Sequence, residues 1–245
     1  MCQLTDGLFF KQDMDLICLG NCVGCLKVNL SLFSDLSDNE LELINRGRNK
    51  YFFKKGDTVF TEGSQPLGLN CLSMGKVKLV KAGKIEDEFI VGLFKPVDFI
   101  GFDHLMSNSP YSYSAIALEE VTLCIIKKEN LFSVISKNVG LATKIIDHLS
   151  QKLIIQNERL LILTQTKLES RLAYTLLDLI NFFGFEADGK TLAVELKRKE
   201  IASLSSMNTA NVIRMMSHFK KLKIINTKLR KIQILRLDLL KNLVD

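Results

Sequence analysis

The feature that most constrains this chain is a change of hydrophobic period along it. From Tyr51 to Ile126, short runs rich in β-branched and aromatic residues alternate with turn signals such as Lys55-Gly56-Asp57. Many short strands at even spacing predict a β-barrel or roll. Ser37 and Glu40 have the spacing of a capping box, which predicts a short helix before the first strand. Residues 141–177 then follow a helical period, so we expect an α+β protein.

One side of that helical stretch has the 3.5-residue spacing of a coiled-coil seam. Gln156 is a polar residue within the seam, and such residues set register or weaken association. We expect the helix to form a parallel homodimer, and the alternative is an amphipathic helix that lies against its own barrel. The predicted seam residues are Ile146, Leu149, Leu153, Gln156, Leu160 and Leu163.

The C-terminal part, residues 178–245, contains the pattern of a winged helix-turn-helix. Arg198 to Leu204 forms the first predicted helix, and 205–207 forms the turn. Asn208 is a good N-cap for a second helix that ends near Lys221. Residues 192–194 predict a short strand, and 228–237 a β-hairpin wing. On the second helix, the inward face is predicted to consist of Val212, Met216 and Phe219.

This part of the chain is also strongly basic. From Lys190 onward there are 13 Lys or Arg and 4 Asp or Glu, in a chain whose net charge is +6. A basic domain on a slightly acidic body is typical of a nucleic-acid binder, although a solvated surface without a partner is the alternative. Arg214 is the candidate for guanine and Asn211 for adenine. The predicted DNA-binding residues are Lys197, Lys199, Asn208, Thr209, Ala210, Asn211, Ile213, Arg214, Ser217 and Lys220, with Lys221 as a further phosphate contact.

Three cysteines, Cys18, Cys22 and Cys25, lie within eight positions near the start of the chain, and Cys124 lies in a predicted strand far downstream. Four thiolates hold an iron–sulfur cluster, so a distant fourth cysteine could complete the set. A zinc site or a thiol–disulfide switch are the rival interpretations. The remaining alternative is that the cysteines bind nothing and Cys124 packs inside the barrel.

Other function classes have little support. No uncharged apolar run approaches the ~20 residues that span a bilayer, and no secretory signal is visible, so we expect a cytoplasmic protein without a membrane segment. The sequence contains no P-loop, no Rossmann glycine fingerprint, no nucleophile elbow and no H-E-x-x-H motif. We therefore expect that the protein is not an enzyme.

The order of these parts resembles the CRP/FNR family of regulators, and most closely its fumarate and nitrate reduction regulator (FNR) branch. The resemblance is based on the Cys18-x3-Cys22-x2-Cys25 spacing, Gly101-Phe102-Asp103, Cys124, residues 169–173 and residues 199–219. It implies an N-terminal cysteine segment (1–30) and a jelly-roll sensor of the cyclic-nucleotide-binding type (31–140). A dimerisation helix (141–177) and a winged helix-turn-helix domain (178–245) follow.

The same resemblance implies a transcriptional regulator that senses oxygen or redox state through a [4Fe-4S] cluster. Cys22, Cys25 and Cys124 match ligands of the family, but Ser31 stands where the family has a fourth. We expect Cys18 to take that place, with Cys2 and then Cys71 as weaker substitutes. The family also implies a homodimer on a pseudo-palindromic double-stranded operator, with RNA polymerase as a partner. The alternative is a regulator that senses thiol oxidation, haem or nitric oxide without a cluster. For haem, His104 is the one plausible histidine ligand, although we expect it to have a surface role.

Departures from the family refine these expectations. Cyclic nucleotide pockets of the CRP branch use an arginine and a glutamate, whereas this chain has Tyr113 and Phe102 there, so a nucleotide phosphate lacks its donors. We therefore expect no cyclic nucleotide to bind. Ala210 replaces a glutamate that could accept from cytosine, which predicts a different operator. Gln156 replaces an acidic residue that opposes dimerisation, so dimers should form more readily.

Overall fold

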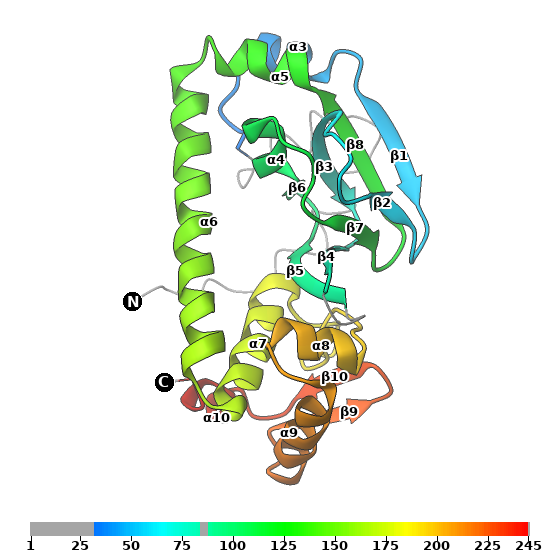
Figure 1. Ribbon diagram of the computed structural model, residues 1–245, viewed down its shortest axis with the longest axis vertical. Coiled ribbons are helices and arrows are strands. Elements are labelled where there is room, and N and C mark those ends of the chain that lie inside the picture. The colour runs from blue at the N-terminus through cyan, green and yellow to red at the C-terminus, as the bar shows by residue number, and fades with distance from the viewer. Residues whose placement is uncertain (1–31, 84–87, 245) are drawn as a thin grey trace. The chain divides into compact units, whose positions relative to one another are not determined.

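The protein divides into two compact units. The structure is a computed structural model that describes residues 32–83 and 88–244. Among the described residues, the first unit contains 32–82 and 91–150, and the second contains 83, 88–90 and 151–244. Helix α6 (Val139–Gln165) contributes to both units. The α+β class is as predicted, because strands dominate the first unit and helices the second (Figure 1).

Two four-stranded sheets lie at the centre of the strand-rich domain and confirm the predicted roll. The first has the strand order β1-β8-β3-β6, and the second has the order β2-β7-β4-β5. The strands of the first sheet are β1 (Asn49–Phe53), β8 (Val121–Lys127), β3 (Gly68–Met74) and β6 (Phe99–Ile100). The strands of the second sheet are β2 (Thr58–Phe60), β7 (Ser114–Ala117), β4 (Val77–Ala82) and β5 (Glu88–Phe94).

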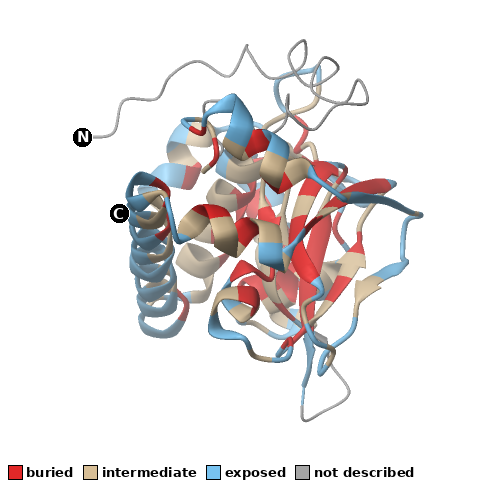
Figure 2. Ribbon diagram, turned by 90° about the horizontal axis from the view of Figure 1, so that it is seen from above, coloured by how far each residue is buried: buried red, intermediate tan, exposed pale blue. Residues whose placement is uncertain are grey.

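Strands β3 and β8 of the first sheet are buried on both faces, whereas β1 is largely exposed. One face shares a hydrophobic cluster with the second sheet, to which Leu72, Leu79 and Leu123 belong. The opposite face, which we call the helix-covered face, packs Leu69 and Ile126 against helical residues such as Leu131 and Ile145. These helices are α3 (Asp38–Asn45), α4 (Phe102–Ser107), α5 (Lys128–Ile135) and the start of α6. Figure 2 shows that the buried residues concentrate on the strands and on the inward sides of these helices.

Local capping explains where α3 and α6 begin. The Ser37 hydroxyl accepts from the Glu40 N–H, and the Glu40 carboxylate accepts from the Ser37 N–H at 2.9 Å, so the predicted capping box is confirmed. Asn138 accepts from the Leu141 N–H at 2.9 Å and also donates to Glu40 at 2.8 Å. One amide therefore both caps α6 and joins it to α3. The sequence did not predict α4 and α5.

The single helix expected over 141–177 is wrong. Helix α6 ends at Gln165, and α7 (Leu168–Phe183) begins after a break. The Arg171 guanidinium donates to the carbonyl of Thr166 at 2.9 Å and to that of Thr164 at 3.3 Å. These charge-assisted bonds satisfy carbonyls at the end of α6, which would otherwise lack partners, and so favour the break.

The second unit contains α7, α8 (Arg198–Leu204), α9 (Thr209–Lys221) and α10 (Leu237–Asn242), together with the hairpin of β9 (Ile225–Lys228) and β10 (Lys231–Ile234). The predicted hairpin over 228–237 is therefore displaced by three residues. Leu229 occupies the turn with φ +54°, and the buried Ile225, Ile232 and Ile234 set the register. The strand expected at 192–194 is also wrong, because Leu192 forms only an isolated bridge with Phe185.

Within the described residues, no helix combines the length and the apolar character needed to cross a bilayer.

Candidate functional site

Helices α8 and α9 form the helix-turn-helix with the bounds predicted from the sequence. Asn208 is the N-cap of α9 and accepts from the Asn211 N–H at 2.8 Å. Ser206 takes a left-handed conformation in the turn, with φ +50°. Val212, Met216 and Phe219 are buried, which confirms the inward face of α9. The cap, the turn and this apolar face together fix which side of α9 meets solvent.

The outward face of α9 carries the polar side chains proposed to contact bases. Arg214 is exposed and donates to the Asn211 side chain at 3.0 Å. That bond pre-orients the guanidinium toward the N-terminal half of the helix, which is the part of a recognition helix that reads base edges. Ala210, Ile213, Ser217 and Lys220 are exposed on the same helix, while Thr209 and Asn211 are partly exposed.

Basic residues surround this helix. Lys197 and Lys199 are exposed at the start of α8, as are Lys220 and Lys221 at the end of α9. Arg198 donates to the carbonyl of Leu229 at 3.4 Å and so connects α8 to the wing. Burial lowers the pKa of Arg198. The side chain still keeps its positive charge at neutral pH, because the ordinary pKa of a guanidinium is far above neutrality. The result is a cationic surface suited to phosphates.

The cysteine set is only partly within the described residues. Cys2, Cys18, Cys22 and Cys25 lie outside them. Cys124 is 1% exposed on β8, on the helix-covered face of the first sheet. Among the described residues, no group of three His, Cys, Asp or Glu side chains could hold a metal ion. Cys124 could therefore serve a cluster only together with thiols from the first 31 residues.

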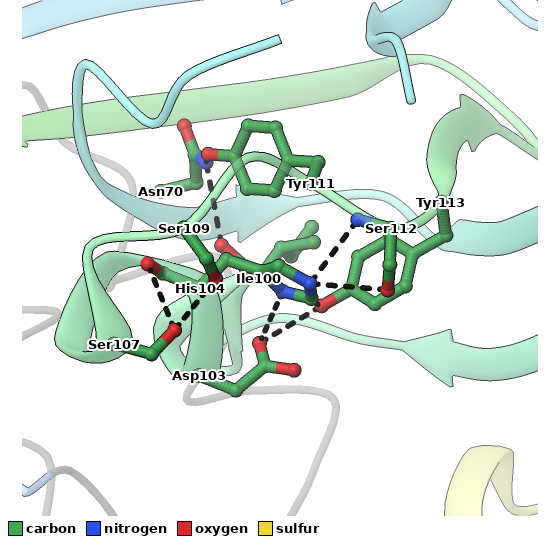
Figure 3. A network of polar contacts seen from close by, with 9 residues as sticks. All are labelled: Asn70, Ile100, Asp103, His104, Ser107, Ser109, Tyr111, Ser112 and Tyr113. Carbon is green, nitrogen blue, oxygen red and sulfur yellow. Dashed lines mark hydrogen bonds and ion pairs between the residues drawn. The ribbon is translucent and has the colours of Figure 1, made fainter. Parts of the chain in front are cut away.

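A polar network centred on His104 lies where α4 meets the 108–113 loop (Figure 3). The Ser112 N–H donates to His104 Nε2 at 3.1 Å, so Nδ1 carries the ring proton. His104 Nδ1 lies 3.2 Å from Asp103 Oδ1 and 3.1 Å from the Tyr113 hydroxyl, which itself donates to Asp103 at 2.8 Å. Both ring nitrogens are thus engaged, and the side chain is only 12% exposed. The expected surface role of His104 is therefore wrong.

Two buried tyrosines fill the space beside this network. Tyr111 stacks on Phe60 with ring centroids 3.8 Å apart, and its hydroxyl accepts from Asn70 at 2.8 Å. Burial raises the pKa of Tyr111 to about 12. Burial also raises the pKa of Tyr113, and the neighbouring Asp103 carboxylate adds to the shift. Both phenols therefore stay protonated at neutral pH and act as neutral hydrogen-bonding groups.

Gly101 allows Tyr111 to approach the start of α4. It takes φ +71°, and a Cβ placed on it would lie 2.4 Å from Tyr111 Cε1. Replacing Gly101 with alanine should cost roughly 2–5 kcal/mol, since left-handed strain adds to the clash with a buried ring. Gly63→Ala is the matched control, because Gly63 has φ +83° with nothing within 4 Å of its added Cβ. We expect that control to cost about 1 kcal/mol from strain alone.

Tyrosine fluorescence during urea unfolding measures both changes, because the chain contains no tryptophan. Equal losses in the two variants would contradict the close packing of Tyr111 against Gly101.

Helix α6 exposes large apolar side chains at heptad spacing. Ile146, Leu153 and Leu160 are 66%, 63% and 61% exposed, and Gln156 is exposed as well. Two residues of the predicted seam differ, since Leu163 is buried within its own chain and Leu149 packs against the sensor core. The apolar surface continues instead through Ile154 and Leu161, which are 51% and 63% exposed. The heptad pattern includes both the exposed and the internally packed residues of α6, so the sequence could not distinguish them.

Comparisons with known proteins agree with this arrangement. The cyclic nucleotide-binding domain family matches residues 50–138, and the Crp-like helix-turn-helix domain family matches residues 170–243. The chain belongs to the CRP/FNR family of transcriptional regulators. Electron transport regulator A from Shewanella oneidensis is 26% identical over 213 residues, which cover 86% of this chain and 85% of that protein. The Fumarate and nitrate reduction regulatory protein from Vibrio cholerae is 26% identical over 222 residues, with 89% and 88% covered.

Solved structures of CRP/FNR regulators share the fold. FixK2 from Bradyrhizobium japonicum superposes with a TM-score of 0.70 at 18% identity, covering 81% of this chain and 98% of that chain. A transcriptional regulator of the CRP/FNR family from Thermus thermophilus gives a TM-score of 0.67 at 24% identity, covering 80% and 98%. The two-domain architecture of the family, with a β-sheet domain of the cyclic nucleotide-binding type, a long helix and a helix-turn-helix, is therefore that of this chain.

Membership in the CRP/FNR family gives the His104 network a context, because the matched cyclic nucleotide-binding domain includes it. None of the nine residues in Figure 3 is an arginine or a lysine. Asp103 would repel a phosphate, and the buried Tyr111 and Tyr113 occupy the space beside it. The sequence signal that could have revealed this network was the Asp103-His104 pair soon after Gly101, followed by the Tyr111-Ser112-Tyr113 segment.

Proposed function

We propose that this chain is a redox-responsive regulator of the FNR type. Its operator binding would be controlled by an oxygen-labile [4Fe-4S] cluster on Cys18, Cys22, Cys25 and Cys124. The names of its relatives, which refer to electron transport and to fumarate and nitrate reduction, support this class of signal. Cys124 carries the proposal among the described residues, because it places a thiol on the helix-covered face of the sensor sheet.

The surroundings of Cys124 suit a cluster ligand in part. A cluster held by thiolates is stabilised where water is excluded, and Cys124 is buried next to apolar residues such as Ile126. The cluster, when bound, would supply a centre that oxygen destroys. The residues of this chain would bind it with four sulfurs, of which three come from the segment before residue 32. We propose no cyclic nucleotide ligand, because the His104 network offers a phosphate a carboxylate instead of a guanidinium.

DNA binding would use the outward face of α9. In a symmetric dimer, two recognition helices read half-sites about one helical turn of DNA apart, so a pseudo-palindromic operator is expected. Arg214 and Asn211 would read bases, and Lys197, Lys199 and Lys220 would contact phosphates. RNA polymerase would be the partner in activation. Since all these side chains serve recognition rather than bond making, we propose no catalytic activity.

The test combines colour with DNA binding. Anaerobic reconstitution with iron and sulfide should give a brown protein with about four irons per chain. That protein should bind operator DNA, and exposure to air should bleach it and weaken binding. A colourless protein that binds the same DNA equally well with and without air would reject the cluster proposal and leave the helix-turn-helix assignment standing.

Dimerisation along α6 gives a separate prediction. Leu153→Asp should weaken the dimer by roughly 100-fold or more, since two carboxylates would enter an apolar seam. Sedimentation equilibrium of the anaerobic protein measures the change. Gln151→Glu is the control, because Gln151 is exposed on the opposite side of the same helix and adds the same charge. If both variants associate like the wild type, the exposed stripe of α6 is not the interface.

A further inference from the structure

Cys71 and Cys124 are direct partners across the two central strands of the first sensor sheet. Strands β3 and β8 are neighbours in this sheet and pair antiparallel (Figure 1). Their register sets Cys71 opposite Cys124. The ladder is regular from Gly68 to Leu72, and its irregularity begins only after Leu72. Residues opposite each other in an antiparallel ladder project from the same face of the sheet. Both thiols therefore lie on the helix-covered face.

The two thiols differ in their access to solvent. Cys124 is buried, whereas Cys71 is partly exposed at the edge of the hydrophobic cluster that contains Leu69 and Ile126. The Cys71 sulfur lies 3.8 Å from the Leu69 carbonyl oxygen. A small oxidant can thus reach the Cys71 sulfur first, while the buried Cys124 lies next to it on the neighbouring strand.

Backbone geometry allows the two sulfurs to bond. Opposed residues in an antiparallel pair have Cα atoms about 4.5 or 5.5 Å apart, depending on the hydrogen-bonding position. Both values fall inside the range of about 4.4–6.8 Å found for disulfides. Opposed Cβ atoms lie about 4.5–5.5 Å apart, and disulfides need about 3.5–4.5 Å. The strands therefore keep their register, and a small local approach of the two residues together with χ1 rotations brings the sulfurs together.

We propose that Cys71 and Cys124 form a reversible cross-strand disulfide when a peroxide oxidises the clusterless protein. The Cys71 thiolate attacks one peroxide oxygen, the O–O bond breaks, and hydroxide leaves, which gives a sulfenic acid at Cys71. The Cys124 sulfur then attacks the Cys71 sulfur, the S–O bond breaks, and water leaves with the thiol proton. The two thiols lose two electrons in total, and one hydrogen peroxide is reduced to two waters.

This disulfide would act as a lock on the sensor, a consequence that depends on the proposed cluster. Once its sulfur is bonded to Cys71, Cys124 cannot bind iron, so a cluster could not be rebuilt until a thiol reductant cleaved the bond. Cys71 would thereby convert loss of the cluster into a state that requires both iron and reducing power to reverse.

The test is a cross-link map of the full-length chain. The protein is stripped of iron with a chelator, fully reduced, treated with one equivalent of hydrogen peroxide, alkylated and digested with trypsin. Cleavage after Lys and Arg places Cys71 in peptide 56–76, Cys124 in peptide 85–127, and Cys18, Cys22 and Cys25 together in peptide 12–27. We expect loss of alkylation at Cys71 and Cys124, and a linked 56–76/85–127 species two hydrogens lighter than its parts.

Cys71→Ser should abolish that species, and after the same peroxide treatment it should take up iron without prior reduction, whereas the wild type should not. Linkage of peptide 85–127 to 12–27, or full alkylation of Cys71 and Cys124 when other thiols are oxidised, would overturn the proposal. The wild-type map alone decides this if the variant fails to fold. Failure to bind iron anaerobically would reject the cluster instead, and the cross-link would still be measurable.

Discussion

Cys124→Ala is expected to lose the cluster. The anaerobically reconstituted variant should be colourless, with iron falling from about four per chain to background, because three thiolates cannot complete the coordination of a [4Fe-4S] centre. Removing one buried sulfur from the packed face of β8 should cost only about 1 kcal/mol of unfolding free energy, so the variant should remain folded. Anaerobic absorption spectra with iron and sulfide assays measure the effect.

Cys71→Ala is the matched control for this change. It removes the same atom from the same sheet face, one strand away, at a site that is less buried. We expect the control to keep its iron and its anaerobic affinity for operator DNA. A Cys124 variant with wild-type iron content would remove Cys124 from the ligand set. Loss of iron in the Cys71 variant would instead make Cys71 the ligand that replaces the one missing at Ser31.

The relation between Cys71 and Cys124 shows what a single sequence cannot give. The two residues are 53 positions apart, and their pairing depends on the register of β3 against β8. Strand propensity predicted both strands but contains no information on which residues oppose each other. The sequence therefore predicts Cys71 to be a weak candidate ligand because it falls in a strand, although that strand places it opposite Cys124.

The helix-turn-helix was predictable because its signals are local. The N-cap at Asn208 and the spacing of Val212, Met216 and Phe219 determine α9 within one short segment. The end of α6 was not predictable, since it depends on the bonds from Arg171 to the Thr164 and Thr166 carbonyls rather than on hydrophobic period. Leu163 follows the heptad pattern as well as Leu160 does, but tertiary packing buries only the former.

Because local signals determine α9, the position of Arg214 on its outward face is well defined, and we choose Arg214 for substitution in the DNA-binding unit. Arg214→Ala should weaken binding to the cognate operator by roughly 5- to 150-fold, because a bidentate contact with guanine contributes about 1–3 kcal/mol of discrimination. Binding to unrelated DNA should change much less, since phosphate contacts by lysines supply most of it. The specificity ratio should therefore fall, and titrations of both DNAs at one fixed salt concentration measure it.

Arg48→Ala provides the control. Arg48 donates to the Asn45 side chain at 2.6 Å, as Arg214 donates to that of Asn211, with the same spacing of three residues but in the sensor unit. The two substitutions remove the same charge and the same kind of local bond, so the change in net charge cancels in the comparison. If Arg48→Ala lowers operator affinity as much as Arg214→Ala, the loss reflects total charge and Arg214 reads no base. If Arg214→Ala weakens all DNA equally, then it contacts phosphate, and specificity must come from other residues of α9.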